Sequence, residues 1–310
     1  MQAQFDPDSA AAWQIRLFKK SLTKQVQLHN LQRFLSPTEH KTCLDIGGGN
    51  GILPFMLRRN GGQWVSLESH PPAVAAMKEL FGEDAAHAIV GSELPFEDNC
   101  FDTIVIIDHL EEFKDDAMLL KECHRCLHDK GELLIHVPYH KAFSLSRILR
   151  KILKLDGDED PRIREDYRLK DLYEITKNGY DMVEKQTYSG FFVESGDTWL
   201  QFFSGNHRRG HDDIQTGSQQ NADQQLLRKF AKTYRIYSLF YPFMKIGQGL
   251  DKLLAFTSNH QLVIKARPRP WIERKSVHMR DGRSIADATI NTRIGSAADL
   301  TDPKNNRSST

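Results

Sequence analysis

A short apolar run that ends in a glycine-rich turn constrains this chain more than any other stretch. Residues 43–51 read Cys-Leu-Asp-Ile-Gly-Gly-Gly-Asn-Gly, and a helix-like stretch, 52–59, follows them. This order predicts a strand, a tight turn and the start of a helix. Glycines at 47, 49 and 51 allow positive φ angles and carry no Cβ that would collide with a ligand near the main chain. We therefore expect the turn to bind a ligand against its backbone.

The spacing of these glycines excludes two common phosphate sites. A dinucleotide fingerprint, G-x-G-x-x-G, needs its third glycine at position 52, where the chain has Ile52. A P-loop needs a lysine and then a serine or threonine after its last glycine, but Gly51 is followed by Ile52 and Leu53. The sequence therefore argues against a pyrophosphate cradle and against phosphoryl transfer.

Two acids flank the turn at informative positions. Asp45 lies two residues before Gly47, and Glu68 ends the next apolar run, 64–67. In a doubly wound sheet, an acid at the carboxyl end of the second strand accepts hydrogen bonds from both ribose hydroxyls, and its charge repels a phosphorylated ribose. Glu68 thus predicts a ligand with a free ribose.

Three stretches in order resemble one family, the class I S-adenosylmethionine-dependent methyltransferases. Residues 45–51 resemble the first motif of that family, and 94–105 resemble its L-P-F-x-D-x-x-F-D stretch before the fourth strand. Residues 122–135 resemble its helix, turn and fifth strand. The likeness covers residues 38–140 and, less closely, 165–195. It implies an α/β, Rossmann-like, doubly wound and mostly parallel sheet of seven strands with an antiparallel last strand, plus a helical insertion, and S-adenosyl-L-methionine as cofactor.

The resemblance and the strand ends together give a set of expected cofactor-binding residues. In many relatives an acid after the third strand contacts the adenine amino group, and either Ser92 or Glu93 can take that role here. The full set is Asp45, Gly47, Gly49, Gly51, Glu68, Ser69, Ser92, Glu93, Asp108 and His109.

Candidates for catalysis follow the fourth and fifth strands. Asp108 and His109 come directly after the apolar run 103–107, so they should face the ligand at the carboxyl edge. His109 either accepts a proton from the methyl acceptor, since histidine titrates near neutrality, or packs over the cofactor. Tyr139 and His140 follow the fifth strand, and with Tyr167 they are candidates for acceptor contact.

Neither of two metal-like patterns predicts a metal site. Cys123 and Cys126 have a ligand-like spacing, but the chain has no second cysteine pair, and the resemblance places Cys126 on an apolar helix face. The acidic run 156–160 lacks the ligand pattern of a calcium loop, and we expect a mobile loop there.

The chain divides into five expected parts. They are an N-terminal helical segment (1–37), a methyltransferase core (38–200), a polar loop with a helical insertion (201–258), a final core strand (259–267) and a disordered tail (268–310). Further strands are expected at 88–90, 132–137 and 182–188, and a helix at 168–178 that stops at Gly179.

The segment 226–256 is rich in aromatic and aliphatic residues, and Pro242 should divide it into two helices. This segment can pack against the sheet, form a dimer contact, or hold a lipophilic acceptor near a membrane. The sequence leaves all three open, together with the oligomeric state.

Charge and composition limit the partners and the compartment. A net charge of +1, with no basic stretch interleaved with aromatics on the core, argues against nucleic acid. No leader and no apolar run of about 18 residues is visible, and four cysteines make no disulfide framework, so we expect a cytoplasmic protein, with the inner membrane face as a peripheral site.

These observations predict methyl transfer by in-line displacement to a small molecule, with a lipid, quinone or glycolipid as the lipophilic case. One alternative is a non-catalytic protein that keeps the methyltransferase fold for cofactor binding or assembly. Another is an NAD-dependent oxidoreductase, which Ile52 disfavours.

Overall fold

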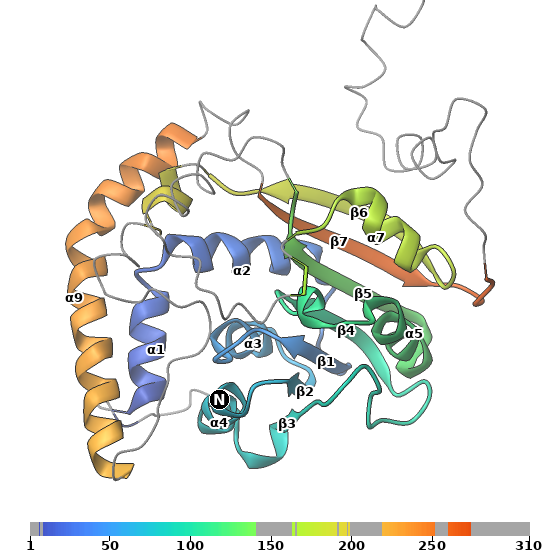
Figure 1. Cartoon of the computed structure of the whole chain (residues 1–310), viewed down its shortest axis with the longest axis horizontal. Coiled ribbons are helices and arrows are strands. Elements are labelled where there is room, and N and C mark those ends of the chain that lie inside the picture. Colours follow the sequence, from blue (N-terminus) through green and yellow to red (C-terminus); the bar gives the residue numbers. More distant parts are fainter. Residues whose placement is uncertain are drawn as a thin grey trace, which may run out of the picture.

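A seven-stranded sheet forms the centre of the molecule (Figure 1). The computed structural model describes residues 6, 9–140, 163–164, 166–190, 192–196, 198, 219–251 and 260–273, with side chains in the segment 219–251 described from residue 227 onward. The strand order is β3-β2-β1-β4-β5-β7-β6. The strands are β1 Thr42–Gly47, β2 Gln63–Glu68, β3 Ala86–Ala88, β4 Phe101–Ile107, β5 Leu127–Pro138, β6 Tyr180–Tyr188 and β7 Gln261–Pro268.

The pairing of the strands confirms the predicted sheet. Strand β7 runs antiparallel to both β5 and β6, while β1, β2, β3, β4 and β5 pair in parallel. The carboxyl ends of the parallel strands therefore meet at one edge of the sheet, the edge where doubly wound folds bind ligands. We call it the carboxyl edge.

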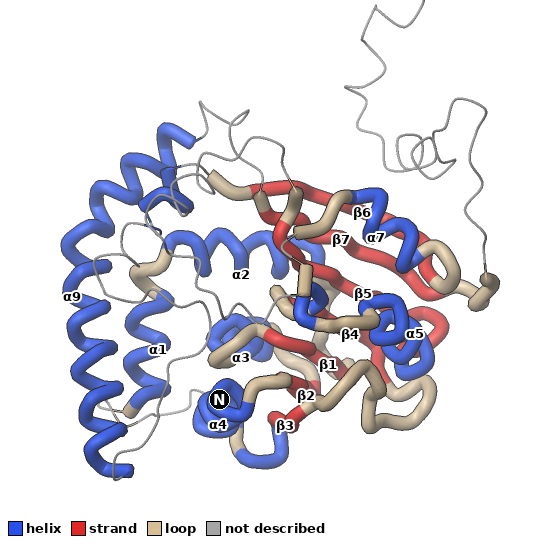
Figure 2. Tube along the Cα trace, viewed as in Figure 1, coloured by secondary structure: helices blue, strands red, loops and turns tan. Residues whose placement is uncertain are grey.

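Helices cover both faces of the sheet (Figure 2). They are α1 Ala10–Phe18, α2 Leu22–Phe34, α3 Ile52–Arg58, α4 Pro71–Phe81, α5 Asp116–Cys126, α7 Leu169–Thr176 and α9 Gln219–Asp251, with short 3-10 turns η1 Glu83–Ala85 and η2 Leu110–Glu112. Serine side chains start the first two: Ser9 accepts from the amide of Ala12, and Ser21 from that of Lys24.

Strand β4 shows why the central strands read as unbroken apolar runs. Ile104 and Ile106 belong to the core cluster that includes residues of α5 and α7, whereas Val105 and Ile107 belong to the cluster under α2 and α3. Because successive side chains point to opposite faces, a strand with helices on both sides has to be apolar throughout.

Several expected boundaries are corrected. The third strand is Ala86–Ala88 and not 88–90, because Val90 is already exposed beyond the sheet edge. The first residues assigned to the tail are ordered on the core: β7 extends to Pro268, and Trp271 packs against Gly179 and His124. The acidic run 156–160 and residues 274–310 lie outside the described residues.

The prediction that Pro242 divides the insertion is wrong. Helix α9 continues through Pro242 to Asp251, and it already begins at Gln219, inside the stretch predicted to be polar loop. A proline inside a helix loses one hydrogen bond and crowds the preceding turn. Here the packing of residues on both sides of it, Tyr237 and Tyr241 before and Met244 after, against Leu22 and Val193 outweighs that local cost.

A buried ion pair fastens the end of α2 to the sheet. The Nζ atom of Lys265 lies 2.9 Å from Oε2 of Glu132 and donates to the carbonyl of Phe34, 3.0 Å away. Ser36 donates to the same carboxylate through its amide, 2.9 Å, and its hydroxyl, 2.5 Å. Burial alone would raise the pKa of Glu132, but the hydrogen bonds from Ser36 and Lys265 outweigh it and lower the pKa below the ordinary 4.5.

We expect Lys265→Met to lower the free energy of unfolding by about 3 kcal/mol at pH 7, because it leaves a buried carboxylate without its cation. Since the pKa of Glu132 is lowered in the folded state, its contribution is full above pH 4.5 and is lost as the pH falls through the folded pKa. Urea unfolding between pH 3 and pH 7 should therefore show a shallower acid-side loss in the variant. Lys78→Met, at the exposed pair with Glu83, is the matched control and should change little. Equal losses in both variants would contradict this assignment.

Candidate functional site

The glycine turn after β1 has one packed side and one open side. Gly47, Gly48, Gly49 and Gly51 all have positive φ angles, of 83°, 93°, 60° and 84°. A Cβ on Gly47 would lie 2.3 Å from Cβ of His109, whereas a Cβ on Gly49 would meet nothing within 4 Å. The turn therefore rests on the segment after β4 and leaves the space beside Gly49 free.

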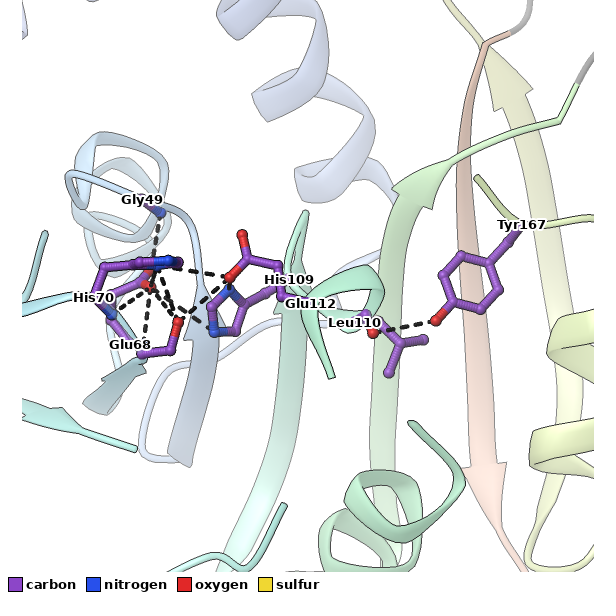
Figure 3. Close-up of polar contacts among 8 residues, drawn as sticks. Gly49, Glu68, His70, His109, Leu110, Glu112 and Tyr167 are labelled. Atoms are coloured by element: carbon purple, nitrogen blue, oxygen red, sulfur yellow. Dashed lines mark hydrogen bonds and ion pairs between the residues drawn. The ribbon is translucent and has the colours of Figure 1, made fainter. Parts of the chain in front are cut away.

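Glu68, at the end of β2, is buried beside this open space (Figure 3). Its Oε2 accepts from the amide of Gly49, 3.2 Å, and its Oε1 accepts from the amide of Ser69, 2.9 Å. The ring of His70 is also in contact, with Nδ1 3.1 Å from Oε1. The carboxylate thus links the turn after β1 to the end of β2.

His109 packs against Gly47 of the turn and lies between Glu68 and Glu112. The side chain is 2% exposed, and its Nδ1 lies 3.1 Å from Oε2 of Glu112. Its Nε2 is 3.8 Å from Oε1 of Glu68 and has no hydrogen-bond partner among the described residues. Burial alone would lower the pKa of His109, but the hydrogen bond to Glu112 and the charges of Glu68, Glu112 and Asp108 outweigh it and raise the pKa. A protonated imidazole between two carboxylates is thereby favoured.

The same three side chains have the spacing of a cation site. One ligand atom from each of Glu68, His109 and Glu112 lies within 4.8 Å of the others. A cation there would take up the carboxylate that the sequence assigns to a ribose, so the two uses of Glu68 compete.

Asp45 lies away from this cluster, although it belongs to the glycine motif. Its side chain is fully buried; Oδ2 accepts from Arg58, 2.9 Å, and Oδ1 from the hydroxyl of Ser66, 2.6 Å. Burial raises the pKa of Asp45 despite the opposing effect of Arg58. In this arrangement Asp45 fastens β1 to β2 and α3.

Asp108 leaves β4 with an unusual backbone and anchors a polar network. Its φ is 47°, in the left-handed region that few non-glycine residues adopt. Oδ2 accepts from Nε2 of Gln27 in α2, 2.6 Å, and Oδ1 lies 2.7 Å from Nδ1 of His136 in β5. The other ring nitrogen of His136 contacts the hydroxyl of Tyr188, at the end of β6. Burial would raise the pKa of Asp108, but His136 and Gln27 lower it, so the carboxylate stays ionised.

The remaining predicted residues are spread around the edge. Ser69 joins the cluster, with its hydroxyl 3.3 Å from Glu112. Ser92 donates to the carbonyl of Asp115, and Glu93 is exposed, so the structure does not bring either into contact with Glu68.

On the β5 side, two of the three candidates are held by the protein itself. His140 pairs with Asp166 through Nδ1, 2.8 Å, and its side chain is partly exposed. Tyr167 is fully buried, with its hydroxyl 2.9 Å from Asp116 and 3.1 Å from the carbonyl of Leu110. Tyr139 donates its amide to the carbonyl of His260. Tyr167 therefore supports η2 and is not in a position to meet an acceptor.

Comparison with known proteins agrees with this geometry. Residues 44–135 match a family model described as a methyltransferase domain. That range includes the glycine turn, Glu68, Asp108 and His109. This match shows that the chain contains a methyltransferase domain. The protein is a methyltransferase that uses S-adenosylmethionine, and the interpretation as an NAD-dependent oxidoreductase is thereby set aside.

Solved structures with a similar chain path include three proteins. A sarcosine dimethylglycine methyltransferase of Galdieria sulphuraria, itself described as putative, is 17% identical over 79% of this chain and 85% of that one, with a TM-score of 0.49. The cyclase SpnF is 14% identical over 81% and 82%, with a TM-score of 0.49. Phosphoethanolamine N-methyltransferase 2 of Haemonchus contortus, in complex with S-adenosyl-L-methionine, is 19% identical over 87% of this chain and 58% of that one, with a TM-score of 0.49. No curated protein matches the chain in sequence.

The methyltransferase site fits its cofactor in two respects. The space beside Gly49, which a Cβ would enter, allows a ligand to approach the backbone. The buried carboxylate of Glu68 and the unpartnered Nε2 of His109 next to it are the kind of polar groups that a ribose can satisfy.

Sequence reasoning missed Gln27, His136 and Tyr188. His136 lies within the apolar run 132–137, and Tyr188 ends β6, so neither stands in a recognisable motif. His136 meets Asp108 because β4 and β5 pair with Ile107 opposite His136. A histidine in an otherwise apolar strand is the one signal that could have found the network.

We expect Gly49→Ala to weaken S-adenosylmethionine binding at least tenfold. Its effect on thermal stability should be close to that of a control substitution at another glycine. The added methyl group enters the open space without meeting protein atoms. The matched control is Gly82→Ala, which also has a positive φ, 101°, and no atom within 4 Å of its Cβ. Thermal unfolding reports the shared backbone cost, and calorimetric titration reports binding. Equal affinities in the two variants would show that no ligand lies against Gly49.

We expect Tyr188→Phe to lower the free energy of unfolding by about 1–3 kcal/mol, because it leaves Nε2 of His136 buried without a partner. Tyr180→Phe is the comparison, since the Tyr180 hydroxyl donates to the carbonyl of Leu120, which lies within α5 and has a second acceptor position. Urea unfolding of both variants should show the larger loss for Tyr188. A smaller loss for Tyr188 than for Tyr180 would mean that the network adds nothing to stability.

Proposed function

We propose that this methyltransferase acts on a small, lipophilic acceptor, and that lipids, quinones and glycolipids are the classes to test first. The binding of S-adenosylmethionine at this edge is supported by the buried carboxylate of Glu68, which lies beside the open side of Gly49. A lipophilic acceptor is supported by the apolar surface of α9, described below.

Each group at the carboxyl edge has a proposed task. S-adenosylmethionine supplies, when bound, a methyl group on a positively charged sulfur. Glu68 accepts hydrogen bonds from the ribose, and the turn of Gly47, Gly49 and Gly51 gives the backbone room to approach it. His109 lies between Glu68 and Glu112 and keeps these two carboxylates apart. We propose an indirect task for Asp45, which holds the strand that carries the turn.

Asp108 and Ser69 remain proposed cofactor contacts. The ionised carboxylate of Asp108 favours a positively charged group in its vicinity, as Coulomb attraction requires. Positioning of this kind, rather than acid–base chemistry, is what an in-line displacement needs most. For Ser92 or Glu93 as the adenine contact we propose that a ligand draws their loop toward the edge.

Among the three histidine and tyrosine candidates, His140 is the proposed proton acceptor. We propose His140 over His109 because the His109 side chain is buried and lies between two acids. His140 is partly exposed, and Asp166 holds its Nδ1. Its Nε2 lies 3.4 Å from the guanidinium of Arg168. Tyr139, next to it, would line the acceptor pocket.

We further propose a cytoplasmic protein that touches the inner membrane face through residues 226–256 and has no nucleic-acid partner. Among the described helices, none is both long and apolar enough to cross a bilayer. The exposed basic and apolar residues of this segment fit contact at the surface of a membrane.

The test is a calorimetric titration of S-adenosylmethionine and S-adenosylhomocysteine, followed by an acceptor screen. We expect Glu68→Gln to weaken binding of both by roughly 10- to 100-fold, because hydrogen bonds to a buried charge are lost. Glu83→Gln, at an exposed acid, is the control. The screen measures methyl transfer to lipophilic phenols, quinols and glycolipids, and His140→Gln should lower turnover without changing cofactor affinity. Binding without transfer to any acceptor would favour the non-catalytic alternative.

A further inference from the structure

Helix α9 presents one unbroken exposed stripe along its length. The exposed positions follow steps of three or four residues, the spacing of a single helix face: Arg228, Lys232, Arg235, Leu239, Phe243, Ile246 and Leu250. From residue 228 to residue 250 the stripe is about 33 Å long at the rise of an α-helix. We call it the α9 stripe.

The stripe is divided by chemistry into two halves. Its first half consists of the three basic residues, and its second half is apolar: Leu239, Phe243, Ile246 and Leu250 are 68%, 67%, 65% and 42% exposed. Pro242 and Phe240 lie next to this apolar half and are exposed too. Exposed aromatic and branched side chains in one contiguous row are unusual for a surface that faces only water.

The opposite side of α9 is already used for packing. The ring of Tyr234 stands edge-on to Trp13 of α1, with centroids 5.8 Å apart. Met244, with Tyr237 and Tyr241 beside it, contacts Leu22, the first residue of α2, and Val193. Figure 1 shows α9 lying along α1, outside the sheet. The stripe is thus the outer side of an outer helix.

Charge decides what can cover the stripe. The sequence from residue 227 to residue 250 contains no aspartate or glutamate, and Lys245 adds a further exposed cation beside the apolar half. A second copy of the same stripe would bring no carboxylates to the basic half. An anionic phospholipid surface offers phosphates to the basic half and acyl chains to the apolar half.

We propose that the α9 stripe docks obliquely on an anionic lipid bilayer, with Arg228, Lys232 and Arg235 at the headgroups and Phe243, Ile246 and Leu250 inserted among the acyl chains. The helix axis is oblique to the membrane because the basic residues occupy one end of the stripe and the apolar residues the other end. In a helix that lies flat, the two kinds of residue would instead be on different sides of the helix.

The docked face is connected to the site by one helix. The first residue of α2, Leu22, packs with α9, and Gln27 of the same helix donates to Asp108 at the carboxyl edge. Helices α9 and α2 would therefore lie between a lipophilic acceptor in the bilayer and the carboxyl edge. Docking deepens the membrane contact proposed above for residues 226–256, and its link to catalysis rests on the proposed methyl transfer to a lipophilic acceptor.

The test is co-sedimentation of the full chain with vesicles of pure phosphatidylcholine and of phosphatidylcholine with 30% phosphatidylglycerol. We expect at least tenfold stronger binding to the anionic vesicles, weakened by salt. Arg228→Gln/Lys232→Gln/Arg235→Gln and, separately, Phe243→Ser/Ile246→Ser should each lower that binding at least tenfold. The matched control, Lys121→Gln/Lys130→Gln/Lys170→Gln, removes the same charge from exposed positions on α5, β5 and α7 and should retain it.

Three results would overturn the proposal. In the first, the wild-type protein binds neither kind of vesicle. In the second, the control variant loses as much vesicle binding as the α9 variants. In the third, the wild-type protein sediments as a dimer and Phe243→Ser/Ile246→Ser sediments as a monomer. Calorimetric titration of S-adenosylmethionine into every variant shows whether the fold is kept. Methyl transfer to a soluble quinol is measured separately. Transfer without docking would contradict the membrane contact alone, and docking without transfer would contradict the proposed methyl transfer alone.

Discussion

The close contact between the glycine turn and His109 is the constraint on which the site depends. Because a Cβ at Gly47 would lie 2.3 Å from Cβ of His109, only glycine lets the turn descend onto the segment after β4. The amide of Gly48 donates to the carbonyl of Ile107 at the same place. His109 is thereby held under the turn, where Glu112 and Glu68 lie on either side of it. One steric requirement thus sets the position of the most buried ionisable groups at the carboxyl edge.

Sequence reasoning reached the parts of this fold that local patterns determine. Unbroken apolar runs indicated strands covered on both faces, and the acid after the run 64–67 indicated the side chain that lies beside Gly49. It could not find the network of Asp108, His136 and Tyr188, because those residues meet through strand register rather than spacing. Nor could it show that Asp45, although part of the glycine motif, is occupied by Arg58.

Pro242 illustrates how a local rule is outweighed by tertiary packing. The rule concerns one hydrogen bond and one steric clash, a cost of about 3 kcal/mol in a helix interior. Buried contacts on both sides of the proline, such as those of Tyr237 and Met244, can supply more than that. The same proline lies on the exposed side of α9. Position on the helix, which the sequence alone does not give, decides the outcome.

Helix α2 shares contacts with almost every feature described above. Its first residue packs on α9, its middle residue Gln27 binds Asp108, and its end is fastened by Lys265 and Glu132. A helix fixed at its end to the sheet can shift only as a lever about that end. Displacement of α9 would then be felt first at Leu22 and next at Gln27, whose hydrogen bond stabilises the ionised carboxylate of Asp108. Helix α2 thus connects α9 to the charged group at the carboxyl edge.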